Sequence, residues 1–268
     1  MSSRIDQHRL FIPLALLLSW GPWVVALLSQ KGFDAGVVKG LLLLGLLGPA
    51  VSAWLLLRNK PDRVKRIFLN RIIDFRLISV RGYLFIVLVP VMLPLLSVLV
   101  STLAGYSFHQ LQLSEEATRS APYFFTFLAY TLLVGPLPEE IGWRGYLLES
   151  LRNDFSGLQS SFIIALVWGI WHVPLFFVEG YPLQGFIASP LLLFTFFGNL
   201  FPLSILYTWL YYANRRSILA AILFHFMINY AGTIIRISPF TELVQFIWLL
   251  VIALFLVLQN KRIFLLRI

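Results

Sequence analysis

The sequence predicts an all-α fold, a polytopic membrane helix bundle of about eight transmembrane helices. Of the 268 residues, 59% are hydrophobic and only 12% are charged, and the mean hydropathy is +0.84. Soluble domains carry about 25% charged residues, and one soluble core could not cover so much apolar surface. Eight apolar runs approach the ~20 residues that cross a hydrocarbon layer. They span about 10–29, 39–57, 82–104, 121–138, 159–178, 187–212, 217–235 and 242–260.

Each of these runs is predicted to be a helix. The runs are continuously apolar, whereas the strands of a membrane β-barrel are about 10 residues long and alternate in polarity. The first run lacks a small-residue cleavage site, so we expect it to stay in the mature protein. Prolines interrupt several runs, as membrane helices tolerate. Because no linker separates the runs, residues 1–268 are predicted to form a single integral membrane domain.

The distribution of Lys and Arg predicts the orientation of the bundle. With eight spans and a cytoplasmic N-terminus, 17 of the 21 cations lie in cytoplasmic segments, as the positive-inside rule requires. The other face carries only Lys31, Lys39, Arg119 and Arg236. The 17 are Arg4, Arg9, Arg58, Lys60, Arg63, Lys65, Arg66, Arg71, Arg76, Arg81, Arg144, Arg152, Arg215, Arg216, Lys261, Arg262 and Arg267. We therefore expect both termini in the cytoplasm.

Composition narrows the possible functions. The net charge of +9 sits in short segments between apolar runs, so membrane topology explains it and no nucleic-acid partner is expected. The absence of cysteine excludes thiol nucleophiles and thiolate zinc sites. The segment from Arg58 to Arg81 is strongly basic. Contact with anionic lipid headgroups and contact with an anionic substrate both stay open for it.

Polar and ionisable residues within spans are costly and are therefore functional candidates. The set consists of Glu139, Glu140, Arg144, His172, His225 and Asn229. Glu140 and Arg144 are four residues apart on one helical face, and the same spacing separates His225 from Asn229. Prolines just before the two glutamates predict that a helix bends or restarts there. A broken helix that carries acids at membrane depth favours a site over a lipid-facing wall.

These residue types suit peptide hydrolysis without a covalent intermediate. A carboxylate beside an imidazole can take a proton from water and return it to a leaving amine. A second imidazole and a carboxamide can donate hydrogen bonds to an oxyanion. Two histidines and one glutamate (His172, His225 and Glu139) could instead hold zinc with an open position for water. The residues leave both the zinc and the metal-free mechanism open.

Three motifs resemble those of the CAAX-protease and bacteriocin-processing family of intramembrane endopeptidases, also called the Abi family. The stretch from Glu139 to Arg144 resembles its EExxxR motif. The second motif, FxxxH, is matched by Trp168 to His172, with Trp in place of Phe. The third, HxxxN, is matched by His225 to Asn229. The resemblance covers about residues 121–235.

The resemblance implies specific roles. Glu139 with His172 would activate the attacking water, His225 and Asn229 would stabilise the oxyanion, and Glu140 and Arg144 would pair as supporting residues. It implies hydrophobic or lipidated peptide substrates, such as prenylated C-a-a-X or bacteriocin-like proteins, in a prokaryotic plasma membrane. A non-catalytic immunity or scaffold protein of the same family is the alternative. A transporter is a third interpretation, because the same residues can relay protons.

The depths of these residues predict a longer fourth span. Hydropathy puts Glu139 at the cytoplasmic end of that span, whereas His172 and His225 lie about 20 Å and 12 Å into theirs at ~1.5 Å per residue. We therefore expect the fourth span to continue past Arg144, to about Ser150. Glu139 would then lie inside a polar, water-filled cavity that opens to the cytoplasm.

Overall fold

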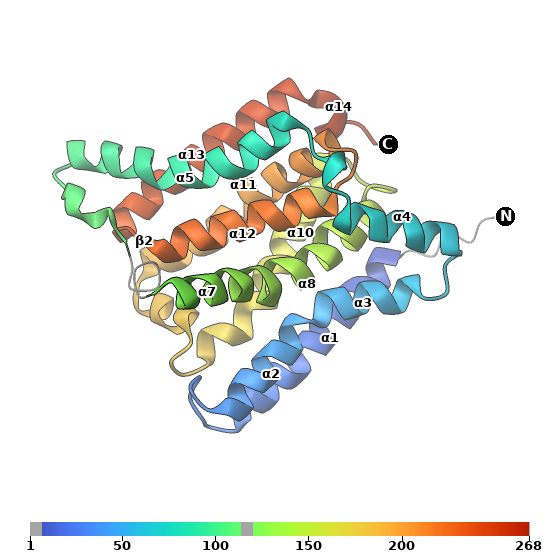
Figure 1. Cartoon of the computed structure of the whole chain (residues 1–268), viewed down its shortest axis with the longest axis horizontal. Helices are drawn as coiled ribbons and strands as arrows, with labels where there is room; N and C mark the ends of the chain where they lie inside the picture. Colours follow the sequence, from blue (N-terminus) through green and yellow to red (C-terminus); the bar gives the residue numbers. More distant parts are fainter. Residues whose placement is uncertain (1–6, 114–119, 268) are drawn as a thin grey trace.

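The computed structural model describes residues 7–113 and 120–267, which form a bundle of packed helices (Figure 1). The first half of the bundle contains α1 (Gln7–Leu28), α2 (Gly36–Leu46), α3 (Gly48–Leu57), α4 (Asp62–Ile73), η1 (Phe75–Leu77), α5 (Val80–Leu103), η2 (Phe108–Gln110) and β1 (Gln112–Leu113). The second half contains α7 (Ala121–Val134), α8 (Pro136–Glu140), η3 (Ile141–Leu147), α9 (Leu148–Leu151), α10 (Gly157–His172), η4 (Val173–Phe177), η5 (Pro182–Ala188), α11 (Pro190–Ala213), α12 (Ile218–Ile234), β2 (Ile235–Arg236), α13 (Pro239–Gln259) and α14 (Lys261–Phe264). Within the described residues, β1 and β2 form only a two-residue antiparallel ladder, so the predicted all-α fold is confirmed.

The predicted membrane spans correspond to helices of the structure. Six segments are long and apolar enough to cross a membrane, namely His8–Leu28, Val80–Leu103, Ala121–Leu151, Gly157–Phe177, Pro190–Ala213 and Pro239–Gln259. A seventh span is possible if α2 and α3, which are bent by 40° at their junction, are counted together. The remaining apolar run forms α12, a shorter helix. The chain is thus a polytopic helical membrane protein, with six or seven candidate spans and one short apolar helix among the described residues.

Serine starts most of the long helices. In each case the serine side chain accepts a hydrogen bond from a backbone N–H in the first turn, which satisfies one of the donors that a helix leaves without a partner. The capping residues are Ser79 of α5, Ser120 of α7, Ser156 of α10, Ser189 of α11, Ser217 of α12 and Ser238 of α13. These caps define where each span begins.

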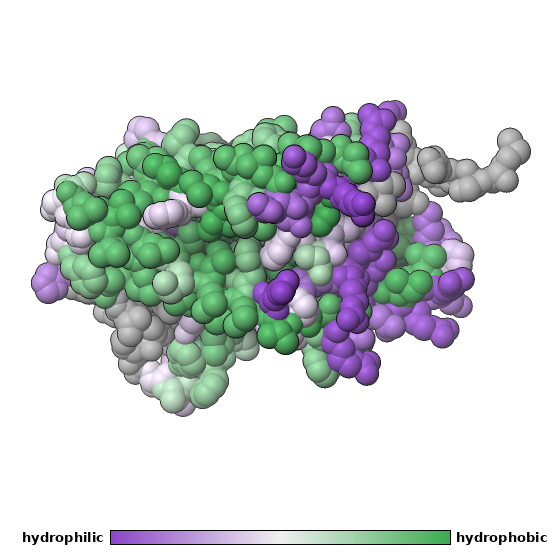
Figure 2. Space-filling view, turned by 90° about the horizontal axis from the view of Figure 1, so that it is seen from above, coloured by the Kyte–Doolittle hydropathy of each residue, from purple (hydrophilic) through white to green (hydrophobic). Residues whose placement is uncertain are grey.

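The face shown in Figure 2 is largely apolar, and its hydrophilic residues gather toward one end. The beginning of α1, the helix α4 and the C-terminal α14 all lie at the same end of the bundle (Figure 1). Helix α4 has no buried residue, and Arg58, Arg63 and Arg66 are exposed in this region. This basic end is the one that the positive-inside rule assigns to the cytoplasm, and that assignment stays a prediction. Arg4 and Arg119 lie outside the described residues.

Indole groups fasten α1 to the helix that carries the second motif. The Trp171 Nε1–H of α10 donates to Ser19 Oγ at 2.7 Å. The Trp20 Nε1–H of α1 donates to the Trp171 carbonyl at 3.1 Å. The rings of Trp23 and Trp171 pack with their centroids 4.8 Å apart. Because the indole N–H groups of Trp20 and Trp171 both have partners across this contact, α10 is held in one rotational position about its axis.

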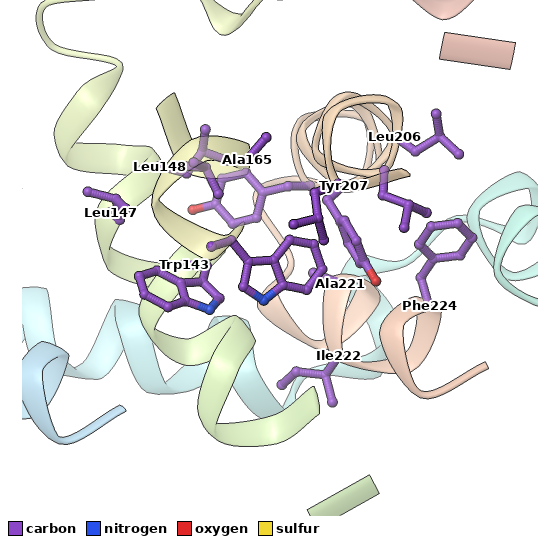
Figure 3. Close-up of a cluster of buried hydrophobic side chains, with 14 of the residues drawn as sticks. Trp143, Leu147, Leu148, Ala165, Leu206, Tyr207, Ala221, Ile222 and Phe224 are labelled. Carbon is purple, nitrogen blue, oxygen red and sulfur yellow. The ribbon is translucent and has the colours of Figure 1, made fainter. Parts of the chain in front are cut away.

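A close-packed apolar cluster lies beside the helix of the first motif (Figure 3). Its side chains come from η3, α9, α10, α11 and α12 and are Trp143, Leu147, Leu148, Ala165, Leu206, Tyr207, Ala221, Ile222 and Phe224. All of them are at most 1% exposed. A polar link joins two of these elements, since Ser161 Oγ of α10 donates to Thr208 Oγ1 of α11 at 2.8 Å. This packing fixes η3 against α10, α11 and α12.

The first motif runs directly into a π-helix, η3, and the wider turn is accommodated by glycine. A Cβ atom at Gly142 would overlap the Pro49 side chain and would lie 2.8 Å from the Pro49 carbonyl carbon and oxygen. A Cβ atom at Gly145 would lie 2.9 Å from Ile218 and 3.0 Å from Phe68. Short π-helical segments occur frequently at functional sites. Here glycine lets the segment after Glu140 approach the backbone of α3.

Replacing Gly142 with alanine is expected to destabilise the protein by about 1–3 kcal/mol, because the backbone of α3 must shift to admit a methyl group. Thermal unfolding of the detergent-solubilised protein measures this. Gly21→Ala is the matched control, since nothing lies within 4 Å of a Cβ at Gly21, and alanine favours a helix by about 0.5–1 kcal/mol. Equal melting temperatures for the two variants would contradict the close approach at Gly142.

Candidate active site

Three stretches that are far apart in the sequence converge at one place. Glu139 and Glu140 end α8, His172 ends α10, and His225 lies within α12. The chain turns into α8 at Gly135, and the helix restarts with Pro136 as its first residue. This is the break that the prolines predict. The span then continues to Leu151, which agrees with the longer fourth span expected from the depths of the motifs.

Glu140 lies at the centre of a buried charged network. Its Oε1 accepts from Arg144 Nη1 at 2.9 Å, so the predicted pair is present. The same oxygen lies 2.7 Å from His225 Nδ1. Glu140 and Arg144 are 0% exposed and His225 is 4% exposed. A carboxylate oxygen can only accept, so His225 Nδ1 carries a proton and Nε2 is the nitrogen directed to other partners.

The Arg144 guanidinium is enclosed by Trp168 of the second motif and by two residues outside the motifs, Ser204 and Tyr207. Its Cζ lies 4.0 Å from the ring centroid of Tyr207 and 4.6 Å from that of Trp168. Its Nη2 donates to Ser204 Oγ at 3.3 Å. Ser204 and Tyr207 are three residues apart on α11, and this spacing inside an apolar span is the signal that could have identified them. Aromatic faces and a carboxylate together allow the cation to be buried.

Glu139 faces the other side of α8 and contacts the second motif. Its Oε2 accepts from the Trp168 indole Nε1 at 2.7 Å. The side chain is 5% exposed. A Cβ atom built at Gly135 would lie 3.5 Å from Glu139 Oε1 and 3.9 Å from Asn229 Nδ2. The carboxylate and the carboxamide therefore flank the same glycine, which brings Asn229 to the first motif.

His172 is held by the backbone of its own helix. Its Nδ1 lies 2.7 Å from the carbonyl oxygen of Trp168. A carbonyl oxygen can only accept, so Nδ1 carries the proton and Nε2 of the neutral ring has a free lone pair. The ring packs against Trp171 and Phe196, with centroids 4.8 Å and 5.3 Å away. The Nε2 nitrogen of His172 is therefore suited to accept a proton or to bind water.

The site changes from enclosed to open across its width. Glu140 and Arg144 are fully buried, whereas His172 is half-buried and Asn229 is exposed. An apolar hollow lies between α5 and α13, away from Glu139, with a lining that includes Met92 and Trp248. This hollow does not correspond to the predicted polar cavity. A water-filled cavity at the site stays a prediction.

The candidate zinc ligands Glu139, His172 and His225 are each hydrogen-bonded through one of their polar atoms. Among residues 7–113 and 120–267, no three His, Cys, Asp or Glu side chains are grouped so that they could hold a metal ion. Oxygen Oε2 of Glu139 is bound to an indole and Nδ1 of His225 to a carboxylate. These hydrogen bonds leave Oε1 of Glu139 and the Nε2 atoms of His172 and His225 as the remaining donor atoms, and bonds of this kind also orient the histidines of metal sites. The zinc and the metal-free mechanism therefore both stay predictions.

Comparisons with known proteins find a family match over the part of the chain that carries the candidate site. A family model described as type II CAAX prenyl endopeptidase, Rce1-like, matches residues 121–231. That range includes all three motifs. A curated relative, CAAX prenyl protease 2 of Methanococcus maripaludis, is 31% identical over 267 residues, which is 98% of each chain. The similarity thus extends through the first hundred residues, which carry no motif.

Proposed function

Because this chain belongs to the Rce1-like family of type II CAAX prenyl endopeptidases and is an intramembrane protease, we propose that it hydrolyses a peptide bond near the C-terminus of prenylated C-a-a-X substrates. The curated relative is named CAAX prenyl protease 2, and the match covers 98% of each chain. A bacteriocin-like hydrophobic peptide is the second substrate class. In both cases the substrate is held at the membrane and reaches the site laterally from the lipid.

In the proposed mechanism, Glu139 is the general base. Its carboxylate, with His172 Nε2 beside the same indole, takes a proton from a water molecule as the water oxygen bonds to the scissile carbonyl carbon. Asn229 Nδ2 and His225 Nε2 donate hydrogen bonds to the resulting oxyanion. The C–N bond then breaks as the proton passes to the leaving amine. The single observation that carries this proposal is the convergence of Glu139, His172 and His225 around Trp168.

The proposed scheme also sets which nitrogens of the His225 ring carry a proton. To donate through Nε2 while Nδ1 donates to Glu140, the ring must carry protons on both nitrogens. The Glu140 carboxylate at 2.7 Å stabilises such a charged ring. Glu140 and Arg144 are therefore proposed as supporting residues that orient His225, and they make no contact with the substrate. The basic end of the bundle is proposed to face the cytoplasm and anionic lipid headgroups.

The test is cleavage by the purified chain in lipid vesicles. Two synthetic peptides with the same C-a-a-X sequence, one farnesylated and one not, are incubated with it, and the products are identified by mass spectrometry. We expect loss of the last three residues from the farnesylated peptide. Binding of that peptide without any cleavage would favour the non-catalytic scaffold, and proton-driven uptake without cleavage would favour a transporter.

In the metal-free scheme proposed here, chelation is expected to leave hydrolysis within about twofold of its original rate, because Glu139 and His172 activate the water without an ion. The protein is dialysed against EDTA and assayed in metal-free buffer. Loss of cleavage that zinc alone restores would contradict the metal-free scheme. Magnesium serves as the control ion, since it prefers oxygen ligands in octahedral geometry.

A further inference from the structure

Among the described residues, Trp168 contacts residues of all three motifs, namely Glu139, His172 and His225. Its indole Nε1 donates to Glu139 at 2.7 Å, and its carbonyl oxygen lies 2.7 Å from His172 Nδ1. Its ring centroid lies 5.4 Å from that of His225. Trp168 is 4% exposed. One residue therefore fixes three groups that come from α8, α10 and α12.

The contact with Glu139 makes the two carboxylate oxygens different. Oxygen Oε2 is occupied by the indole N–H, while Oε1 lies on the side of Gly135 and Asn229. Because Oε2 already accepts the indole N–H and no described residue donates to Oε1, Oε1 is the more basic oxygen and the one better able to take a proton from water. That oxygen faces the carboxamide proposed to bind the oxyanion. The attacking water is thereby confined to the space beside Asn229.

The FxxxH motif has phenylalanine at this position, and phenylalanine has no donor. Phenylalanine would keep a ring beneath Arg144, whose Cζ lies 4.6 Å from the Trp168 ring, but it could not bind the carboxylate. The hydrogen bond is thus a property of this chain that packing alone does not require. Bonds from a donor to a charged carboxylate are among the stronger ones in proteins.

We propose that Trp168 is a positioning residue of the hydrolysis: its indole N–H holds Oε2 of Glu139 so that Oε1 is the oxygen that activates water. The inference rests on the proposed role of Glu139. It assigns the indole a function in the chemical step and none in substrate binding.

The experiment removes only the N–H group. Benzothienylalanine, in which sulfur replaces the indole N–H at nearly constant shape, is introduced at position 168 of the full chain by amber suppression. Cleavage of the farnesylated C-a-a-X peptide is then measured. We expect kcat to fall about 10- to 100-fold, the effect of losing a hydrogen bond to a charged group, with KM unchanged. Trp168→Phe is expected to show the same separation of kcat from KM.

The matched control is the same replacement at Trp23 of α1. Its indole donates to the carbonyl oxygen of Leu42 in α2 at 3.0 Å, and it is 0% exposed. We expect kcat within about twofold of the original value, with a similar loss of thermal stability in both analogues because each loses one buried hydrogen bond. Wild-type kcat in the position-168 analogue, together with a slow Trp168→Phe variant, would show that Trp168 acts by packing and would overturn the inference.

The two proposals fail in different ways. If Glu139→Gln retains full activity, the proposed catalytic role of Glu139 is wrong and the inference about Trp168 is wrong with it. If Glu139→Gln is inactive and the position-168 analogue has both its original kcat and its original KM, only the inference about Trp168 is wrong. A rise in KM at constant kcat would assign Trp168 to substrate binding and would also overturn it.

Discussion

Replacing Glu139 with glutamine is expected to lower kcat by about 10³- to 10⁴-fold, with no loss of folded protein. Removal of a general base typically costs this much because no other group is placed to accept the proton from water. Glutamine has nearly the same shape as glutamate. Its carbonyl oxygen can still accept the hydrogen bond from Trp168 Nε1, which lies 2.7 Å from the Glu139 carboxylate in the unaltered protein. The measurement is the initial rate of peptide cleavage in vesicles, with unfolding temperature recorded in parallel.

Glu242 provides the matched control for this substitution. It is also a glutamate within a span and is partly buried, and it accepts from Thr195 Oγ1 at 3.3 Å between α11 and α13. Glu242→Gln is expected to leave the cleavage rate unchanged, because Glu242 contacts none of the three motifs in the described contacts. Equal rates for Glu139→Gln and the unaltered protein would remove Glu139 from the mechanism.

Replacing Arg144 with methionine is expected to destabilise the protein by about 3–5 kcal/mol and to abolish cleavage. The substitution leaves Glu140 buried at 0% exposure without its guanidinium partner, and an uncompensated buried charge costs energy of this order. His225 loses its orientation as well, because it binds the same carboxylate oxygen. Equilibrium unfolding in increasing SDS measures the stability.

A double variant separates stability from function. Adding Glu140→Gln to Arg144→Met removes the unpaired charge, so part of the lost stability is expected to return while cleavage stays absent. Lys65→Met is the control for charge removal, since the Lys65–Asp62 pair at 2.7 Å is exposed and exposed pairs contribute little. If Arg144→Met unfolded at the same SDS concentration as Lys65→Met, the buried network would not be structurally important.

Much of the bundle could be predicted from the sequence because hydropathy reports directly on length and burial in lipid. All eight apolar runs form helices. The longer fourth span, to Leu151, agrees with the prediction from the depths of Glu139 and the two histidines in the membrane. The bend between α2 and α3 and the π-helical turn after Glu140 were not predicted. At each place a glycine packs closely against another helix, Gly48 against Ser19 of α1 and Gly142 against Pro49 of α3, and no local pattern reports such a contact. A single domain over residues 1–268 stays a prediction.

The candidate site could be predicted in part for a similar reason. Spacing within a helix predicted the Glu140–Arg144 pair, since both residues lie on one face. It did not predict that Glu140 also binds His225, nor that Tyr207 and Ser204 surround Arg144. Those contacts join residues 60 or more positions apart and depend on helix rotation. The catalytic roles themselves stay predictions until cleavage is measured.

Helix α12 carries two of the proposed catalytic groups and, with 17 residues, is shorter than the helices counted as full spans. At ~1.5 Å per residue it is about 25 Å long, less than the ~30 Å of a typical hydrocarbon layer. Hydrophobic mismatch of this size is relieved when the bilayer thins locally. The headgroup region, and the water within it, would then reach deeper along this flank than elsewhere around the protein. A lipid-anchored chain end would thus meet His225 and Asn229 in a hydrated dimple of the membrane.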